Sequence, residues 1–142
     1  MAAARDARYG LLADFACRLS GAHRTAIVTA HTEDDQAETF VMRLGRGSGV
    51  SGLSAMRSVR VLREQYGIDL VRPLLSVSKA RLRATLAERG VEAIDDPTNA
   101  DHTYERTRVR AAMRSLDGAG VTAAAIARSA ARCARADEAA RW

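Results

Sequence analysis

The chain has 142 residues, of which 47% are hydrophobic and 27% charged, and its formal net charge is +5. This length predicts one compact domain or a piece of a larger one, and the apolar content excludes an intrinsically disordered chain. No apolar run approaches the roughly 18 residues of a membrane span, and residues 1–14 lack the apolar core of a secretory signal. Cys17 and Cys133 are too far apart in the sequence for a CxxC metal site. We therefore expect a cytoplasmic protein.

The positive charge is concentrated in the second part of the chain. Residues 1–50 carry six basic and six acidic residues, whereas residues 51–142 carry 16 basic and 11 acidic residues. A basic excess of this kind favours a polyanion partner such as nucleic acid. It fits an ordinary solvated surface equally well, so the choice depends on motifs.

The first half of the chain has the pattern of an α/β domain. Residues 4–19 are predicted to form a helix whose apolar stripe consists of Tyr9, Leu12, Ala16 and Leu19. Residues 25–30 (TAIVTA) indicate a buried parallel strand. Thr32 and Asp35 have capping-box spacing for a second helix, which ends at the glycine-rich residues 45–49. Its expected buried face consists of Ala37, Phe40, Val41 and Leu44. The order helix, strand, helix predicts a parallel sheet.

The second half combines a hairpin with helices. Residues 57–63 and 68–72 are predicted strands joined through residues 64–67, and Pro73 closes the second strand. Ser78 is the predicted cap of a helix over residues 79–89 that Gly90 ends. Turn residues at 95–99 precede a basic helix over 103–115 and an alanine- and arginine-rich helix over 121–142. That last helix is expected to continue to the final residue, which favours a chain cut at this point.

Residues 31–39 (HTEDDQAET) place a histidine and four carboxylates just after a predicted strand. Glu38 lies four residues after Asp34 and three after Asp35, so it can share a helical face with either. Ligands of parallel sheets bind at the carboxyl ends of the strands. The cluster suits an ammonium group or Mg²⁺, and it equally suits a solvated helix start, where carboxylates complement the helix dipole. Zinc fits less well because no cysteine is near.

The same run resembles the HxxDDxxET signature of N-type ATP pyrophosphatases that modify tRNA. Other runs follow in the order of one branch of that family: Arg5–Tyr9 upstream, then Arg46–Gly49 with Gly52 and Leu53, Arg72–Leu75, Asp95–Asn99, and Tyr104, Arg106 and Arg110. Over most of residues 4–116 the chain is similar to the tRNA(Ile)-lysidine synthetase family.

This resemblance implies a fold and a reaction. Residues 1–75 would form part of a parallel-sheet nucleotide-binding domain of the adenine nucleotide alpha hydrolase type. Residues 76–116 would continue it as helices, and residues 117–142 would begin a helical linker or a following domain. ATP, with Mg²⁺, would adenylate C2 of the anticodon wobble cytidine of a tRNA(Ile) with a CAU anticodon. Free L-lysine would then displace AMP to form lysidine. A homodimer is a further expectation.

The family pattern also implies site residues. Arg8 and His31 would lie near the nucleotide and the activated base, and Asp35 and Glu38 would receive the lysine ammonium and assist proton removal. Arg72 would bind the lysine carboxylate or a phosphate, although without the resemblance it indicates a surface arginine beside a turn proline.

The expected catalytic residues are His31, Asp35, Glu38 and Arg8. The expected phosphate contacts are Arg8, His31, Arg46, Gly47 and Gly49, and the expected tRNA contacts are Arg106, Arg108, Arg110 and Arg114. Asp95, Asp96 and Asn99 are expected to shape a turn, and no bound metal is expected on these residues.

The sequence departs from the family pattern chiefly in one element. The SGGxDS loop, which in the family holds the pyrophosphate of ATP and supplies a magnesium-binding aspartate, does not occur in the 142 residues. Thr32 and Thr107 replace a common histidine and asparagine. We therefore expect a fragment that is inactive alone. Two alternatives stay open: a related tRNA thiolase, which the absence of a cysteine pair disfavours, and a non-catalytic RNA-binding remnant.

Overall fold

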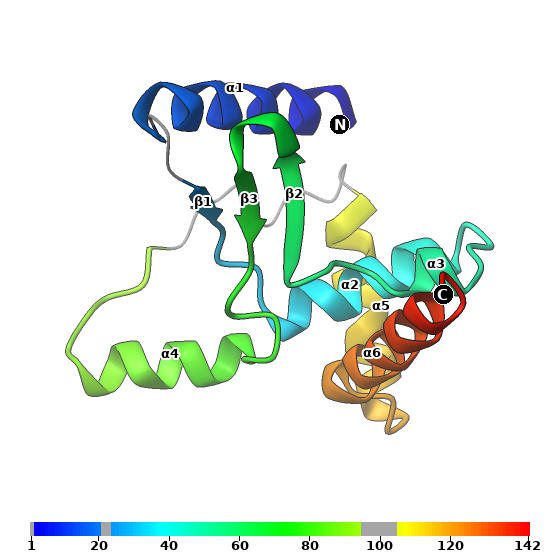
Figure 1. Ribbon diagram of the computed structural model, residues 1–142. Coiled ribbons are helices and arrows are strands. Elements are labelled where there is room, and N and C mark those ends of the chain that lie inside the picture. Colours follow the sequence, from blue (N-terminus) through cyan, green and yellow to red (C-terminus); the bar gives the residue numbers. More distant parts are fainter. Residues whose placement is uncertain (1, 21–23, 95–104) are drawn as a thin grey trace. The chain divides into compact units, whose positions relative to one another are not determined.

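The computed structural model describes residues 2–20, 24–94 and 105–142, which form two compact units (Figure 1). We call Met1–Ala30 with Arg57–Pro73 the sheet unit, and His31–Met56 with Leu74–Trp142 the helical unit. Together they confirm the α/β class, with a small sheet that includes a parallel pair and a separate set of helices. None of the helices among the described residues has the length and apolarity needed to cross a membrane.

The sheet unit contains helix α1 (Ala2–Ser20) and strands β1 (Thr25–Val28), β2 (Val59–Arg63) and β3 (Ile68–Val71). The strand order is β1-β3-β2, with β1 parallel to β3 and β2 antiparallel to it. The hairpin turns through a short 3-10 helix, η1 (Glu64–Tyr66), and Gly67, whose φ of 59° is left-handed. The predicted parallel strand and hairpin are both confirmed.

The core of the sheet unit differs from the predicted apolar stripe. Ile68 and Leu70 on β3 are fully buried, and α1 buries its alanines Ala13 and Ala16. Small side chains let a helix approach a sheet closely, so the stripe prediction is wrong for Leu12 and Leu19, which are 38% and 69% exposed. The expected full burial of β1 is also wrong. Among the described strands β1 pairs only with β3, and its burial alternates, leaving Ala26 and Val28 exposed.

The helical unit contains α2 (Glu33–Leu44), α3 (Val50–Leu53), α4 (Lys79–Glu88), α5 (Glu105–Gly118) and α6 (Ala123–Ala139). Helix α6 packs against α2 and α3, and α5 packs against α2. Ala37 is fully buried and Phe40 and Val41 are half-buried, as predicted. Leu44 is 54% exposed because it is the last residue of α2.

Local signals fix the ends of these helices. Thr32 and Asp35 form the predicted capping box of α2, and the Ser78 hydroxyl accepts a hydrogen bond from the Arg81 amide at the start of α4. Helix α5 continues to Gly118, beyond its predicted end. Helix α6 ends at Ala139, so its predicted continuation to the final residue is wrong. The short helix α3 was not predicted, and the predicted turn at 95–99 lies outside the described residues.

Candidate functional site

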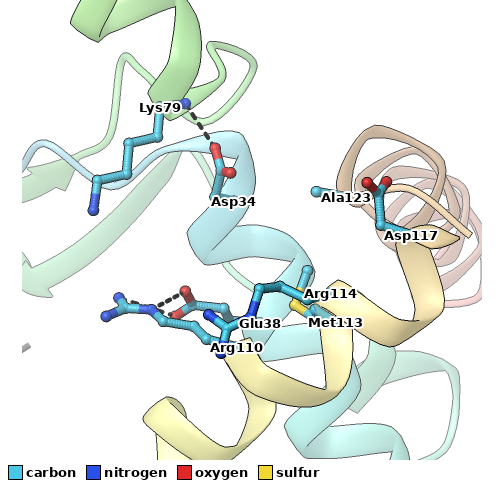
Figure 2. A pocket seen from close by; sticks show the side chains of 8 residues that line it. All are labelled: Asp34, Glu38, Lys79, Arg110, Met113, Arg114, Asp117 and Ala123. Carbon is cyan, nitrogen blue, oxygen red and sulfur yellow. Dashed lines mark hydrogen bonds and ion pairs between the residues drawn. The ribbon is translucent and has the colours of Figure 1, made fainter. Parts of the chain in front are cut away.

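A cavity of about 430 Å³ lies within the helical unit (Figure 2). It is lined by Asp34, Glu38, Lys79, Arg110, Met113, Arg114, Asp117 and Ala123. These residues come from α2, α5 and the first residues of α4 and α6. The lining holds three acidic and three basic side chains, so it suits a small molecule that carries charges of both signs.

Asp34 joins α2 to the start of α4 on one side of this cavity. Its carboxylate accepts a hydrogen bond from the backbone amide of Lys79 at 2.7 Å, and Figure 2 shows it pointing toward that end of α4. The backbone amide of Glu33 donates to the Val77 carbonyl at 3.0 Å nearby. A negative charge at the amino end of α4 also complements the helix dipole.

Glu38 forms the most buried ionic contact of the cavity. Its side chain is only 5% exposed, and Oε1 accepts from Nε of Arg110 at 2.5 Å. Nη2 of Arg110 and Nε of Arg106 lie 3.5 and 3.6 Å from Oε2. The hydrogen bond to Glu38 is the main cause that raises the pKa of Arg110, and the charges of Asp35 and Asp34 add to it.

This contact joins two groups of residues that the sequence assigned to different ligands. Glu38 was expected to bind lysine, whereas Arg106 and Arg110 were expected to bind tRNA. Spacing along one helix could not reveal the pair, because its members are 72 residues apart. Of the expected tRNA contacts, Arg108 and Arg114 are exposed, while Arg106 and Arg110 are two-thirds buried in the side chain.

Asp35 helps to cap the amino end of α2. Its Oδ2 accepts hydrogen bonds from the backbone amide of Thr32 at 2.8 Å and from the Thr32 hydroxyl at 3.0 Å. Both bonds use the same oxygen, so the capping interaction does not engage Oδ1. The half-buried His31 directly precedes this cap.

The glycine-rich loop after α2 is held in place by a side chain that sequence reasoning missed. Nη1 of Arg43 donates to the carbonyls of Gly52 and Ala55 at 2.6 and 2.9 Å. A side chain at Gly52, within α3, would stand 2.6 Å from Cβ of Ser48, so this position requires glycine. Of the expected phosphate contacts, Gly47 has a left-handed φ of 69°, Gly49 precedes α3 as its cap, and Arg46 pairs with Glu105.

Arg72 and Arg8 belong to the sheet unit. Arg72 is 3% exposed, so the simple interpretation of a surface arginine is wrong. Its Nη1 donates to the Arg57 carbonyl at 2.8 Å, while its buried Nε has no hydrogen-bond partner among the described residues. Leaving a buried donor unpaired costs about 1–3 kcal/mol, which points to an acceptor that completes the group. Arg8 is exposed on α1.

Comparison with known proteins identifies the family. The PP-loop domain family matches residues 1–116. The chain belongs to the PP-loop family. This match covers the whole sheet unit and extends through most of α5, and it confirms the resemblance carried by the motifs.

Three relatives of this PP-loop chain carry the name tRNA(Ile)-lysidine synthase. The chain is 51% identical over 139 residues to a tRNA(Ile)-lysidine synthase of Rhodopseudomonas palustris, covering 97% of the chain and 38% of the relative. A tRNA(Ile)-lysidine synthase of Bradyrhizobium diazoefficiens is 53% identical over 138 residues, with 97% and 37% covered. One from Ruegeria pomeroyi is 48% identical over 139 residues, with 98% and 32% covered. The chain thus spans between about a third and two-fifths of the length of these curated relatives.

Proposed function

We propose that this chain forms part of an ATP-dependent ligase that modifies tRNA by joining free L-lysine to C2 of the anticodon wobble cytidine of tRNA(Ile). The observation that carries this proposal is the identity of about half of all residues, over nearly the whole chain, to tRNA(Ile)-lysidine synthases. In the proposed reaction ATP adenylates the C2 oxygen and releases pyrophosphate. The amino group of lysine then attacks C2, loses a proton and displaces AMP.

The cavity of the helical unit is the proposed lysine site. Lysine carries two ammonium groups and one carboxylate, and the lining offers both kinds of complement. Asp117 and Asp34 would bind an ammonium group, and Arg114 would bind the carboxylate. The cavity volume of about 430 Å³ is sufficient for a molecule of this size.

Asp35 and Glu38 then have separate proposed roles. Asp35 would accept the proton from the attacking amine through Oδ1, since capping uses Oδ2. Glu38 would act as a positioning residue, because both of its oxygens already lie against arginines. It would hold Arg110 at the cavity rather than bind lysine itself.

The remaining expected contacts concern phosphate and tRNA. Arg72 has an unpartnered, buried Nε, which supports an anionic ligand such as a phosphate of ATP or a carboxylate. Arg8 and His31 stay proposed nucleotide contacts, and Arg46, Gly47 and Gly49 stay proposed phosphate contacts. Arg108 is exposed and stays a proposed contact of tRNA phosphates, whereas Arg114 is given to the lysine carboxylate instead. Among the described residues no group of three or more His, Cys, Asp or Glu side chains could hold a metal ion.

A chimera tests the proposal. This chain would replace the 139 matched residues of the Rhodopseudomonas palustris relative, and lysidine formation would be measured on tRNA(Ile) with ATP and lysine. We expect the chimera to form lysidine. Asp35→Asn should abolish product while leaving tRNA affinity within a few-fold. Asp117→Asn should raise KM for lysine about tenfold, from the loss of one charged contact of roughly 1.4 kcal/mol.

The control variant is Glu88→Gln, which removes an exposed carboxylate at the end of α4. It should leave the KM for lysine unchanged. A folded chimera that binds tRNA but makes no lysidine would instead support an RNA-binding remnant. Incorporation of sulfur into the tRNA would support the thiolase alternative.

A further inference from the structure

Helix α6 has two sharply different sides. Its buried side faces α2 and α3 and includes Ile126, Ala130 and Asp137. Its opposite side carries three exposed arginines, Arg128, Arg132 and Arg135. At 3.6 residues per turn these three fall within an arc of about 60°. They therefore form one stripe along the outer side of the helix, which we call the α6 arginine stripe.

The α6 arginine stripe is not neutralised by the helix that carries it. None of its three residues takes part in an ion pair with another described residue. Asp137 is turned inward and pairs with Arg141 at 3.0 Å. Glu138, the remaining acidic residue of α6, lies three positions beyond Arg135, at the end of the stripe. Three positive charges thus stand side by side in water.

This arrangement opposes the stability of the helix. Arg128 and Arg132 are four residues apart and Arg132 and Arg135 three, so both pairs repel by about 0.2–0.5 kcal/mol. The many alanines of α6 offset this cost, because alanine has the highest helix propensity. Their small side chains also let an extended ligand approach the helix closely between the arginines.

We propose that the α6 arginine stripe binds the phosphate backbone of RNA. The stripe extends over eight residues, from Arg128 to Arg135, with a rise of about 10 Å along the helix axis. One strand of a duplex carries about three phosphates over that length. Guanidinium groups bind phosphate oxygens in a bidentate manner. Such contacts orient an RNA on the protein without selecting its sequence. The identity of this RNA as tRNA rests on the proposed function, whereas the binding surface rests on the helix.

Salt-dependent binding tests the stripe in the complete 142-residue chain. The affinity for a tRNA transcript would be measured between about 50 and 200 mM salt for the wild type and for the triple variant Arg128→Gln, Arg132→Gln, Arg135→Gln. Loss of three phosphate contacts should weaken binding roughly 10- to 100-fold near 150 mM salt. It should also make the slope of log K against log salt shallower by about 2–3. Because the variant residues are exposed, its far-ultraviolet circular dichroism should be unchanged.

A matched control variant distinguishes the effect of the stripe on tRNA affinity from the effect of total charge. The control is the triple variant Arg18→Gln, Arg81→Gln, Arg89→Gln, which removes the same charge from exposed positions. Arg18 lies on α1, Arg81 on α4 and Arg89 directly after α4. It should weaken binding less than threefold. Equal losses in both triple variants, or wild-type affinity in the α6 variant, would overturn the inference while leaving the proposed function standing. A wild-type chain that binds no tRNA at 50 mM salt would overturn the inference, while the chimera still decides the ligase activity.

Discussion

The sheet unit and the helical unit both bury apolar side chains, but they differ in how their buried charged side chains are paired. In the sheet unit the largest fully buried residues are the apolar Ile68 and Leu70. The sheet unit also buries Arg72, whose Nε has no hydrogen-bond partner among the described residues. In the helical unit the buried carboxylates of Glu38 and Asp137 each pair with an arginine. Apolar burial is non-directional, whereas a buried charge needs one particular partner. Both units therefore depend on apolar contact, and the helical unit adds a buried ion pair to it.

The largest expected effect tests apolar burial in the sheet unit. Leu70→Ala removes a fully buried side chain from β3 and should lower the free energy of unfolding by about 3 kcal/mol. The matched control is Val61→Ala on β2, where the side chain is 54% exposed and the cost should be below about 1 kcal/mol. Urea unfolding followed by circular dichroism measures both. Equal losses would show that β3 does not form the core of this unit.

The second largest expected effect concerns the ion pair of Glu38 and Arg110 in the helical unit. Removing one partner should cost more stability than removing the other. Arg110→Met leaves the Glu38 carboxylate, 5% exposed, with Arg106 at 3.6 Å as its one remaining ion-pair partner among the described residues, and should cost about 2 kcal/mol. Glu38→Gln leaves arginines that are each 33% exposed and can turn to water, so it should cost about 1 kcal/mol.

The double variant Arg110→Met, Glu38→Gln makes the test specific. Neither residue is then left opposite an unpaired charge, so the double variant should be more stable than the sum of the two single losses predicts. Urea unfolding at pH 7 measures all three proteins. Strictly additive losses would mean that the two side chains contribute independently, contrary to the pairing seen here.

In both units the sequence predicts local structure better than long-range packing. Strands, turns and helix caps depend on neighbours within a few residues, so the hairpin and the Thr32 capping box were predictable. The packing face of α1 was not, because the choice between Ala13 and Leu12 depends on how closely the helix approaches the sheet.

In the candidate site too, local features were predictable and contacts between distant residues were not. The motif at residues 31–39 contains Asp34 and Glu38, which the structure places in the lining of the cavity. The pairing of Glu38 with Arg110 and the burial of Arg72 depend on residues distant in the sequence, which no local pattern contains. The ligand assignments inferred from the motif therefore stay predictions, while its local geometry is confirmed.

The smallest expected effect asks how much local capping contributes beside charge pairing. Thr32 takes part in a reciprocal capping box, whereas Thr122 accepts one hydrogen bond from the Ala125 amide at 3.2 Å at the start of α6. Thr32→Ala should therefore cost about 1 kcal/mol and Thr122→Ala about 0.5 kcal/mol. Serine at either position keeps the capping oxygen and should retain most of the stability. Three hydrogen bonds join Thr32 and Asp35, and Thr32→Ala leaves in place the one that the Thr32 backbone amide donates to the Asp35 carboxylate. Its cost in urea unfolding should thus stay below that of Arg110→Met, and a larger loss would place the stability of the helical unit in its local caps rather than in its buried ion pair.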